Sequence, residues 1–236
     1  MTTILHKANT RGHANHGWLN SFHTFSFAGY YDSNRLQFGA LRVLNDDTVA
    51  AGMGFGRHPH ENMEIVSIPL SGDLEHQDST GRHEIIKQGD VQIMSAGRGI
   101  FHSEKNANHD RQVKFLQIWV MPNEINITPR YEQKYFPIVE RKNRFQIVVA
   151  PDDKNAVWIN QNAWFSLGNL DKSIVLSYQL HNNENGVYAF IIKGSVVING
   201  IELLERDGLA LTEITDLEIE AKEEAEVLLI EIPMNK

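Results

Sequence analysis

Two pairs of side chains, each with one residue between its members, are spaced to hold a metal ion. The first pair is His58 and His60, and the second is His102 and Glu104. In a β-strand, residues i and i+2 project from the same face, so the members of each pair point in one direction. If the two strands are neighbours, three imidazoles and one carboxylate converge on one point. The spacing therefore predicts a metal centre in which all four side chains are ligands.

This ligand set favours a divalent transition metal with open coordination positions. Neutral imidazoles suit borderline divalent metals, and a carboxylate adds a hard anionic ligand. On a five- or six-coordinate ion such a set leaves room for substrate and oxygen together. We expect Fe(II) first, with Mn, Co, Ni or Zn as alternatives. Zinc hydrolysis is the chemical alternative, but no paired nucleophile and base is evident, and a structural zinc site is usually rich in cysteine.

Other residues near the pairs need separate interpretations. Taken alone, His58-Pro59-His60 would also fit a surface loop, and the second pair is what favours a metal. Glu64 lies four residues after His60, an even offset. It is either a fifth ligand or, as we prefer, an acceptor for the N–H of a ligand imidazole outside the coordination sphere. The remaining histidines are expected to be structural and hydrogen-bonded, as for His13, His16 and His23, or exposed near turns, as for His76, His83 and His109.

The composition limits the class of protein. The chain has 236 residues, a length that fits two compact domains or one large all-β domain. A net charge of −8 makes direct binding of nucleic acid or an anionic membrane unfavourable, because phosphate neutralisation needs clustered lysine and arginine. The chain has no cysteine, no apolar run of membrane-spanning length and no signal-peptide core near Met1. We therefore expect a cytoplasmic protein.

Short apolar segments separated by turn signals dominate the chain. Such a pattern is typical of an antiparallel sandwich or barrel. Asn45-Asp46-Asp47 is expected to be one of these turns, and residues 113–121 are expected to form a core strand. Further strands are expected at 38–44, 49–53, 64–70, 74–77, 83–86 and 91–94.

A weak internal repeat divides the chain into two domains. Residues 122–137 are polar and contain three prolines, so we interpret them as a linker between domains at 1–125 and 140–236. Aligning the repeats places Leu180 and Asn182 where the first copy has its two histidines, and His181 is one residue out of register. The second domain is therefore expected to lack metal and to serve packing.

The glycines and histidines around the first pair resemble the first motif of the cupin superfamily. Gly52, His58, His60, Glu64 and Gly72 occupy its positions, with one extra residue before the last glycine. Residues 94–104 depart from the second cupin motif, but they resemble the form of that motif in the pirin family. The entry segment, residues 11–27, is also similar to that family. The resemblance is strong over residues 11–125 and weaker but collinear over 140–236.

The resemblance implies an all-β bicupin of two β-barrel or sandwich (jelly-roll) domains, with metal on the four predicted ligands of the first. It implies a metal-dependent dioxygenase of the quercetin 2,3-dioxygenase type, which cleaves a flavonol with O2. Glu104 is the candidate base for the flavonol 3-hydroxyl. The expected apolar pocket walls are Met53, Phe55 and Phe101, whereas Phe115 is expected in the barrel core.

A second function is compatible with the same resemblance. Some pirins are non-enzymatic, metal-containing partners of transcription regulators, and the oxidation state of the metal alters their docking surface. A protein partner is therefore the alternative to a small aromatic substrate. Access to the metal distinguishes the two functions, because an enzyme needs an open cavity that reaches the metal.

Overall fold

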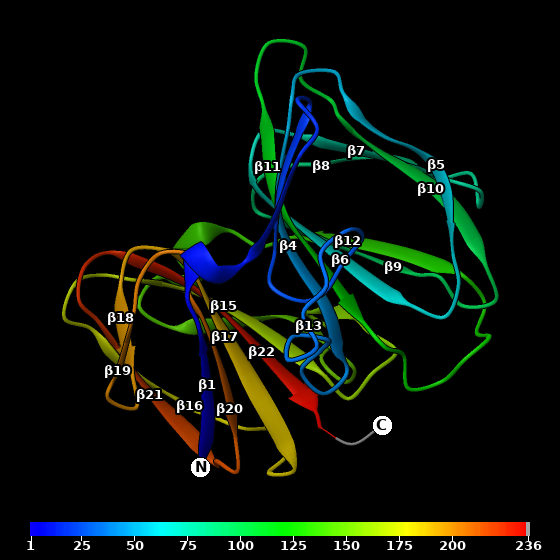
Figure 1. Cartoon of the computed structure of the whole chain (residues 1–236). Helices are drawn as coiled ribbons and strands as arrows, with labels where there is room; N and C mark the ends of the chain where they lie inside the picture. Colours follow the sequence, from blue (N-terminus) through cyan, green and yellow to red (C-terminus); the bar gives the residue numbers. More distant parts are fainter. Residues whose placement is uncertain (235–236) are drawn as a thin grey trace.

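Two β-barrels make up the computed structural model, which describes residues 1–234 (Figure 1). Each barrel combines a seven-stranded and a four-stranded sheet. In spatial order, the seven-stranded sheet of the N-terminal barrel consists of β12 (Arg130–Tyr135), β9 (Asp90–Ser95), β6 (Glu64–Ser71), β11 (Val113–Val120), β4 (Leu41–Val49), β3 (Leu19–His23) and β2 (Gly12–Asn15). Its four-stranded sheet consists of β5 (Gly54–His60), β10 (Ile100–Asn106), β7 (Leu74–Asp78) and β8 (His83–Ile86).

The C-terminal barrel repeats this arrangement. Its larger sheet consists of β1 (Thr2–His6), β20 (Gly208–Thr212), β17 (Asn185–Lys193), β22 (Ala225–Pro233), β15 (Trp164–Leu170), β13 (Phe145–Ala150) and β14 (Val157–Trp158). Its smaller sheet consists of β16 (Val175–Gln179), β21 (Asp216–Ala221), β18 (Val196–Ile198) and β19 (Ile201–Leu203). Two short 3₁₀ helices, η1 (Ala8–Thr10) and η2 (Ile138–Arg141), lie between strands. None of the helices within residues 1–234 is long and apolar enough to cross a membrane. The expected all-β bicupin is confirmed.

Two strands, β1 and β12, do not follow the expected boundaries between the two domains. Strand β1 pairs with β20 of the C-terminal barrel, and Figure 1 shows it, in dark blue, among the strands of that barrel. Strand β12 lies within the predicted linker, yet it pairs with β9 of the N-terminal barrel. The prolines of residues 122–137 misled the prediction, because Pro129 and Pro137 fall just outside β12 and leave its backbone free to pair.

The turn expected at Asn45-Asp46-Asp47 is also wrong. These residues lie inside β4, which runs unbroken between β3 and β11. Both neighbours hydrogen-bond to its backbone, so the weak strand preference of Asn and Asp is overridden by the tertiary context. Asn45 and Asp47 are two residues apart, and both are buried. Their side chains therefore belong to the interior of the N-terminal barrel.

The interiors of the two barrels differ in chemistry. The two large sheets share one apolar core, in which Leu41 and Ile118 of one barrel cluster with Phe165 and Leu228 of the other. The C-terminal barrel is filled mainly by aliphatic side chains such as those of Leu217 and Ile219, although it also buries Glu231 and Asn185. In the N-terminal barrel, the buried polar side chains include Ser67, His76, Gln92, His102, Glu104, Asn106 and Gln117. Because buried polar groups cost stability unless they are paired, this interior indicates a function other than packing.

Strand β1 brings a buried histidine into the second barrel, and this gives a pH-dependent contribution to stability. The Nδ1 atom of His6 lies 2.9 Å from the hydroxyl of Tyr188. Burial, helped by the charge of Arg35, lowers the pKa of His6 from 6.5 to about 4. The unfolded chain therefore binds more protons than the folded one between these values. We expect the free energy of unfolding to fall by about 3 kcal/mol from this residue as the pH drops from 7 to 4.

A His6→Gln variant should lose that part of the slope when urea denaturation is measured across the same pH range. The exposed His13, changed to Gln in the same way, is the matched control and should keep the slope of the wild type. An unchanged slope in the His6 variant would contradict the assignment.

Candidate metal centre

The two predicted ligand strands lie side by side. Strands β5 and β10 are antiparallel neighbours, and His102 is directly opposite His58. A β-bulge follows, because Glu104 is opposite Phe55 and β5 has an extra residue between the two pairings. The close approach at this end requires glycine: a Cβ on Gly54 would lie 2.3 Å from the carbonyl oxygen of Glu104. The predicted pairing of the strands is therefore present, with a bulge that the sequence pattern did not predict.

Three imidazoles meet at this point. The ring centroids of His58 and His102 are 4.5 Å apart, and those of His60 and His102 are 4.8 Å apart. One ring nitrogen from each of the three histidines lies within 4.8 Å of the others. Within residues 1–234, this is the one group of three such side chains with the spacing of a metal site.

The state of these imidazoles fits a metal ion. Nδ1 of His58 donates to the carbonyl of Gly56 at 2.7 Å, which leaves Nε2 free as a ligand. Both ring nitrogens of His102 are buried, and neither has a hydrogen-bond partner among the described residues. Burial, with smaller effects from the neighbouring histidines, lowers the pKa of His60 to about 4 and that of His102 to about 3. Both imidazoles are therefore neutral at pH 7, which is the form that binds metal.

Glu104 is held beside the three histidines. It is 2 % exposed and lines the same cavity as His58 and His60. Its carboxylate accepts a hydrogen bond from Gln117 at 2.6 Å and one from Ser67 at 3.2 Å. Each carboxylate oxygen has two lone pairs, so these bonds fix its orientation and leave acceptor capacity unused.

A cavity of about 470 Å³ opens beside the histidines. Four aromatic rings line it: Trp18, Phe27, Phe55 and Trp119. Trp119 packs edge-on against both His60 and Phe27, with centroid distances of 4.8 and 5.4 Å. On the sheet side the cavity is polar, with Ser21, His23, Asn45, Asp47 and Gln117. The cavity can therefore accept a flat, apolar molecule that also has polar groups.

Of the three predicted pocket residues, one lines the cavity and two do not. Phe55 lines the cavity, and the bulge is the reason, because it brings this odd-numbered residue onto the face of His58. Met53 and Phe101 do not line it, and they are 45 and 47 % exposed. Phe101 is adjacent to His102, so strand alternation turns it outward, where Arg57 lies over its ring. Phe115 is a core residue, as expected.

Glu64 is not placed as expected. It begins β6, on the other sheet, and is fully buried. Its carboxylate accepts hydrogen bonds from the hydroxyl of Ser95 at 2.7 Å and from the backbone N–H of Asn160 at 3.2 Å. The second bond joins the two barrels. Among the described hydrogen bonds of Glu64, none goes to a ligand imidazole. The chain turns between His60 and Glu64, so the two residues lie on different strands and the i+4 spacing no longer places them on one face.

The expectations for the other histidines are met only in part. His13 and His23 are hydrogen-bonded, as expected, but they lie in strands β2 and β3, and His16 lines the cavity. His83 and His109 are exposed, as expected. The expectation for His76 is wrong: it is 1 % exposed, and its Nε2 lies 3.0 Å from the carboxylate of Asp78. Its ring centroid is 5.4 Å from that of His102.

Sequence reasoning missed most of the polar wall of the cavity. Residues 113–121 looked like a uniform core strand, but Gln117 and Trp119 are two residues apart and face the site. Asn45 and Asp47 have the same spacing, as do Ser21 and His23. Polar residues at alternate positions within apolar strands are the signal that could have found them.

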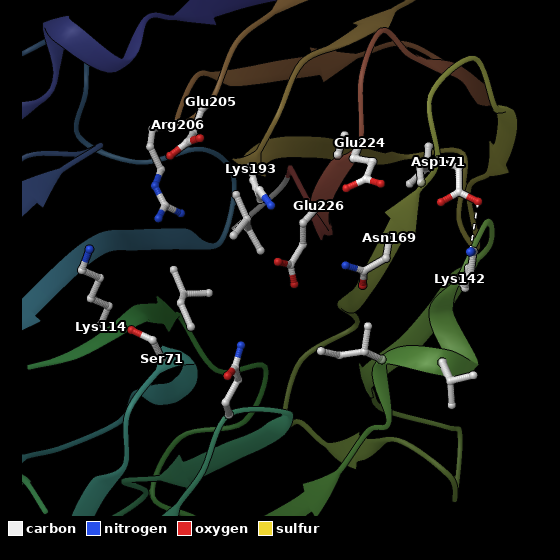
Figure 2. Close-up of a pocket in the computed structure, with 17 residues that line it drawn as sticks. Ser71, Lys114, Lys142, Asn169, Asp171, Lys193, Glu205, Arg206, Glu224 and Glu226 are labelled. Atoms are coloured by element: carbon white, nitrogen blue, oxygen red, sulfur yellow. Dashed lines mark ion pairs between the residues drawn. The ribbon is translucent and has the colours of Figure 1, made fainter. Parts of the chain in front are cut away.

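A larger groove lies elsewhere. It has a volume of about 750 Å³ and is lined by residues of both barrels (Figure 2). Acidic and basic side chains mix in it, and some pair with each other, as Lys142 does with Asp171 at 3.2 Å. The histidine cluster does not line this groove. Size alone therefore does not locate the chemistry of this protein.

Comparison with known proteins places the chain in a family. The Pirin family model matches residues 5–120, and the model of the quercetinase C-terminal cupin domain matches residues 147–232. A quercetin 2,3-dioxygenase of Escherichia coli K12 is 47% identical over 230 residues, which cover 97% of this chain and 98% of the relative. The chain belongs to the pirin family. The resemblance seen in the motifs is thereby confirmed.

Solved structures agree with this membership. The bacterial pirin YhhW of E. coli in complex with nickel(II) is 45% identical, with a TM-score of 0.93, covering 98% of this chain and 99% of that one. A quercetin 2,3-dioxygenase of Acinetobacter baumannii is 21% identical, with a TM-score of 0.77, covering 98% of this chain and 78% of that one. At this identity the second likeness concerns the fold alone.

Proposed function

We propose that this pirin is a metal-dependent dioxygenase that cleaves a flavonol such as quercetin, with O2 as the second substrate. The observation that supports the proposal most directly is the cavity of about 470 Å³ that reaches His58 and His60 between aromatic walls. A redox-responsive partner of a transcription regulator would not need such access, so the cavity favours the enzyme. The E. coli relative named quercetin 2,3-dioxygenase supports the same choice.

The proposed ligands are His58, His60, His102 and Glu104. When bound there, a divalent metal supplies a Lewis acid and a redox centre for the reaction with O2. Fe(II) remains our first choice, and Mn, Co, Ni and Zn are alternatives; the related E. coli pirin holds nickel in its crystal structure. The largely aliphatic interior of the C-terminal barrel supports a packing role without metal for that domain. The lack of cysteine supports a reducing compartment such as the cytoplasm.

The residues around the proposed ligands would orient the substrate and move its proton. The aromatic rings of Trp119 and Phe55 would hold a flat substrate by apolar contact and exclude water. Glu104, oriented by Ser67 and Gln117, would accept the proton of the flavonol 3-hydroxyl. Loss of this proton makes the substrate electron-rich, as ring cleavage by O2 requires.

Oxygen uptake with quercetin tests this function. Protein is loaded separately with Fe(II), Mn, Co, Ni and Zn, and uptake is recorded beside a His58→Ala variant. We expect uptake that requires a metal and that is lost in the variant, because only two imidazoles remain. Binding of every metal without oxygen uptake by any of them would refute the dioxygenase and would favour a search for protein partners.

A further inference from the structure

The sheet wall of the cavity has a polar row in strand register. His23, Asn45 and Gln117 are direct partners across β3, β4 and β11. Gln117 is in turn opposite Ser67, which hydrogen-bonds Glu104. Cross-strand partners project from the same face of a sheet, so the row leads from Glu104 along the cavity wall. Ser21 and Asp47 form a second pair of partners beside it.

Asp47 is the unusual member of this wall. Asp47 is 3 % exposed, and its Oδ1 accepts a hydrogen bond from the hydroxyl of Ser21. The described residues that line the cavity include no lysine or arginine. A carboxylate has about four acceptor positions, and Ser21 fills one. The remaining acceptor capacity of Asp47 has no basic side chain of the cavity lining to pair with, and burying such a group is costly unless the ligand brings hydrogen-bond donors.

The charge of the surroundings limits which donors are suitable. Burial raises the pKa of Asp47 to about 7; the Ser21 hydroxyl works against this, and the charge of Glu104 adds to it. Apart from the proposed metal ligand Glu104, Asp47 is the one carboxyl group among the described residues that line the cavity, and as an acceptor it favours neutral O–H donors of a ligand. The neighbouring Asn45 uses its Oδ1 for His23 at 3.0 Å, so its side-chain NH2 is a donor for the same ligand.

We propose that Asp47, together with Asn45 and Ser21, forms a subsite that binds the hydroxyl groups of a polyhydroxylated aromatic substrate. The inference rests on the proposed function, because it names the substrate features that this same cavity selects. A site that hydrogen-bonds a substrate hydroxyl discriminates strongly against an analogue without it, because the buried protein group is then left unpaired. Asp47 is thus a specificity-determining residue. Asp47 recognises ring hydroxyls of the substrate other than the 3-hydroxyl, which would lie at the metal ligands.

Two ligands separate this subsite from general apolar binding. Quercetin has additional hydroxyls on both of its aromatic ends, whereas 3-hydroxyflavone keeps the same ring system and the 3-hydroxyl only. Dissociation constants are measured under nitrogen, in nickel-loaded and in metal-free protein, by quenching of tryptophan fluorescence. Trp18 and Trp119 line the cavity and report the binding. No turnover is needed for this measurement.

Wild-type protein should bind quercetin at least about tenfold more tightly than 3-hydroxyflavone. In Asp47→Asn this preference should fall to about threefold or less, through weaker quercetin binding, because one acceptor becomes a donor. The exposed Asp110, changed to Asn in the same way, is the matched control and should keep the preference. If Asp47→Asn does not fold, Ser21→Ala should show a smaller loss in the same direction.

The inference is overturned if wild-type protein shows no preference or binds neither ligand. It is also overturned if the Asp47 variant, or Ser21→Ala in its place, weakens both ligands equally or changes neither. Failure of the proposed function would be seen elsewhere, as absent oxygen uptake with every metal, whatever the binding constants. The two failures are therefore distinguishable.

Discussion

His102→Ala is expected to abolish metal binding and oxygen uptake with little effect on the stability of the metal-free protein. His102 is 2 % exposed and has two buried ring nitrogens without partners among the described residues. In the metal-free protein these unpaired nitrogens lower the stability of the folded state. Their removal therefore offsets much of the stability that is lost with the packing of the ring. With metal bound, the same imidazole is one of the four proposed ligands. We expect the dissociation constant for metal to rise at least about a hundredfold.

Thermal unfolding with and without metal measures this directly. A ligand at about 100 times its dissociation constant stabilises a folded protein by about 2.7 kcal/mol, so wild-type protein should show a clear rise in Tm. The His102 variant should show none at the same metal concentration. His83→Ala is the matched control, because the side chain of His83 is 61% exposed and is not one of the clustered histidines. A metal-dependent rise in Tm that survives in the His102 variant would remove this residue from the ligand set.

Glu231→Ala is expected to destabilise the C-terminal barrel by about 3 to 4 kcal/mol. Glu231 is fully buried in β22, and its carboxylate accepts from the hydroxyl of Tyr178 and the side chain of Asn185, each at 2.9 Å. It also accepts from the backbone N–H groups of His181 and Asn182. Removal of the carboxylate leaves the buried donors of Tyr178 and Asn185 unpaired, and each buried orphan costs about 1 to 3 kcal/mol, without full additivity.

Protonation of Glu231 should act in the same direction. Burial alone would raise the pKa of Glu231, but the hydrogen bonds from His181, Asn182 and Asn185 outweigh it and lower the pKa. A depressed pKa in the folded state stabilises the protein above the ordinary glutamate pKa, and this contribution is lost as the pH falls. The cost of Glu231→Ala should therefore be smaller in acid than at pH 7.

Urea denaturation followed by tryptophan fluorescence tests the Glu231 prediction. Trp164 stacks on the ring of His181 at 4.7 Å, so it reports this region. Glu218→Ala changes an exposed glutamate in the same barrel and should stay within about 0.5 kcal/mol of wild type. A cost below about 1 kcal/mol for Glu231→Ala would contradict the network. Oxygen uptake by the folded variant should be unchanged, because the proposed site lies in the other barrel.

The sequence by itself determined the strand character of the chain and the convergence of three histidines. Both follow from local rules. Side chains in a strand alternate with a period of two, so His58 and His60 had to share a face, and a hydrogen-bonded partner strand was enough to bring His102 to them. The same rule places Phe101 on the opposite face from His102, so the prediction of Phe101 as a pocket residue was wrong and already conflicted with strand alternation.

Only the tertiary structure decided which other side chains share the cavity. The bulge in β5 shifts the alternation and turns Phe55 inward, and bulge positions depend on the partner strand. Asn45 and Asp47 looked like a turn because their residue types favour turns, yet two neighbouring strands hold them in β4. Glu64 bonds Asn160, and β1 joins the second barrel, because both contacts form between segments far apart in sequence. Local preferences contain no information about such distant pairings. The cluster of three histidines could therefore be predicted, whereas which strands supply the walls around it was decided by the tertiary structure.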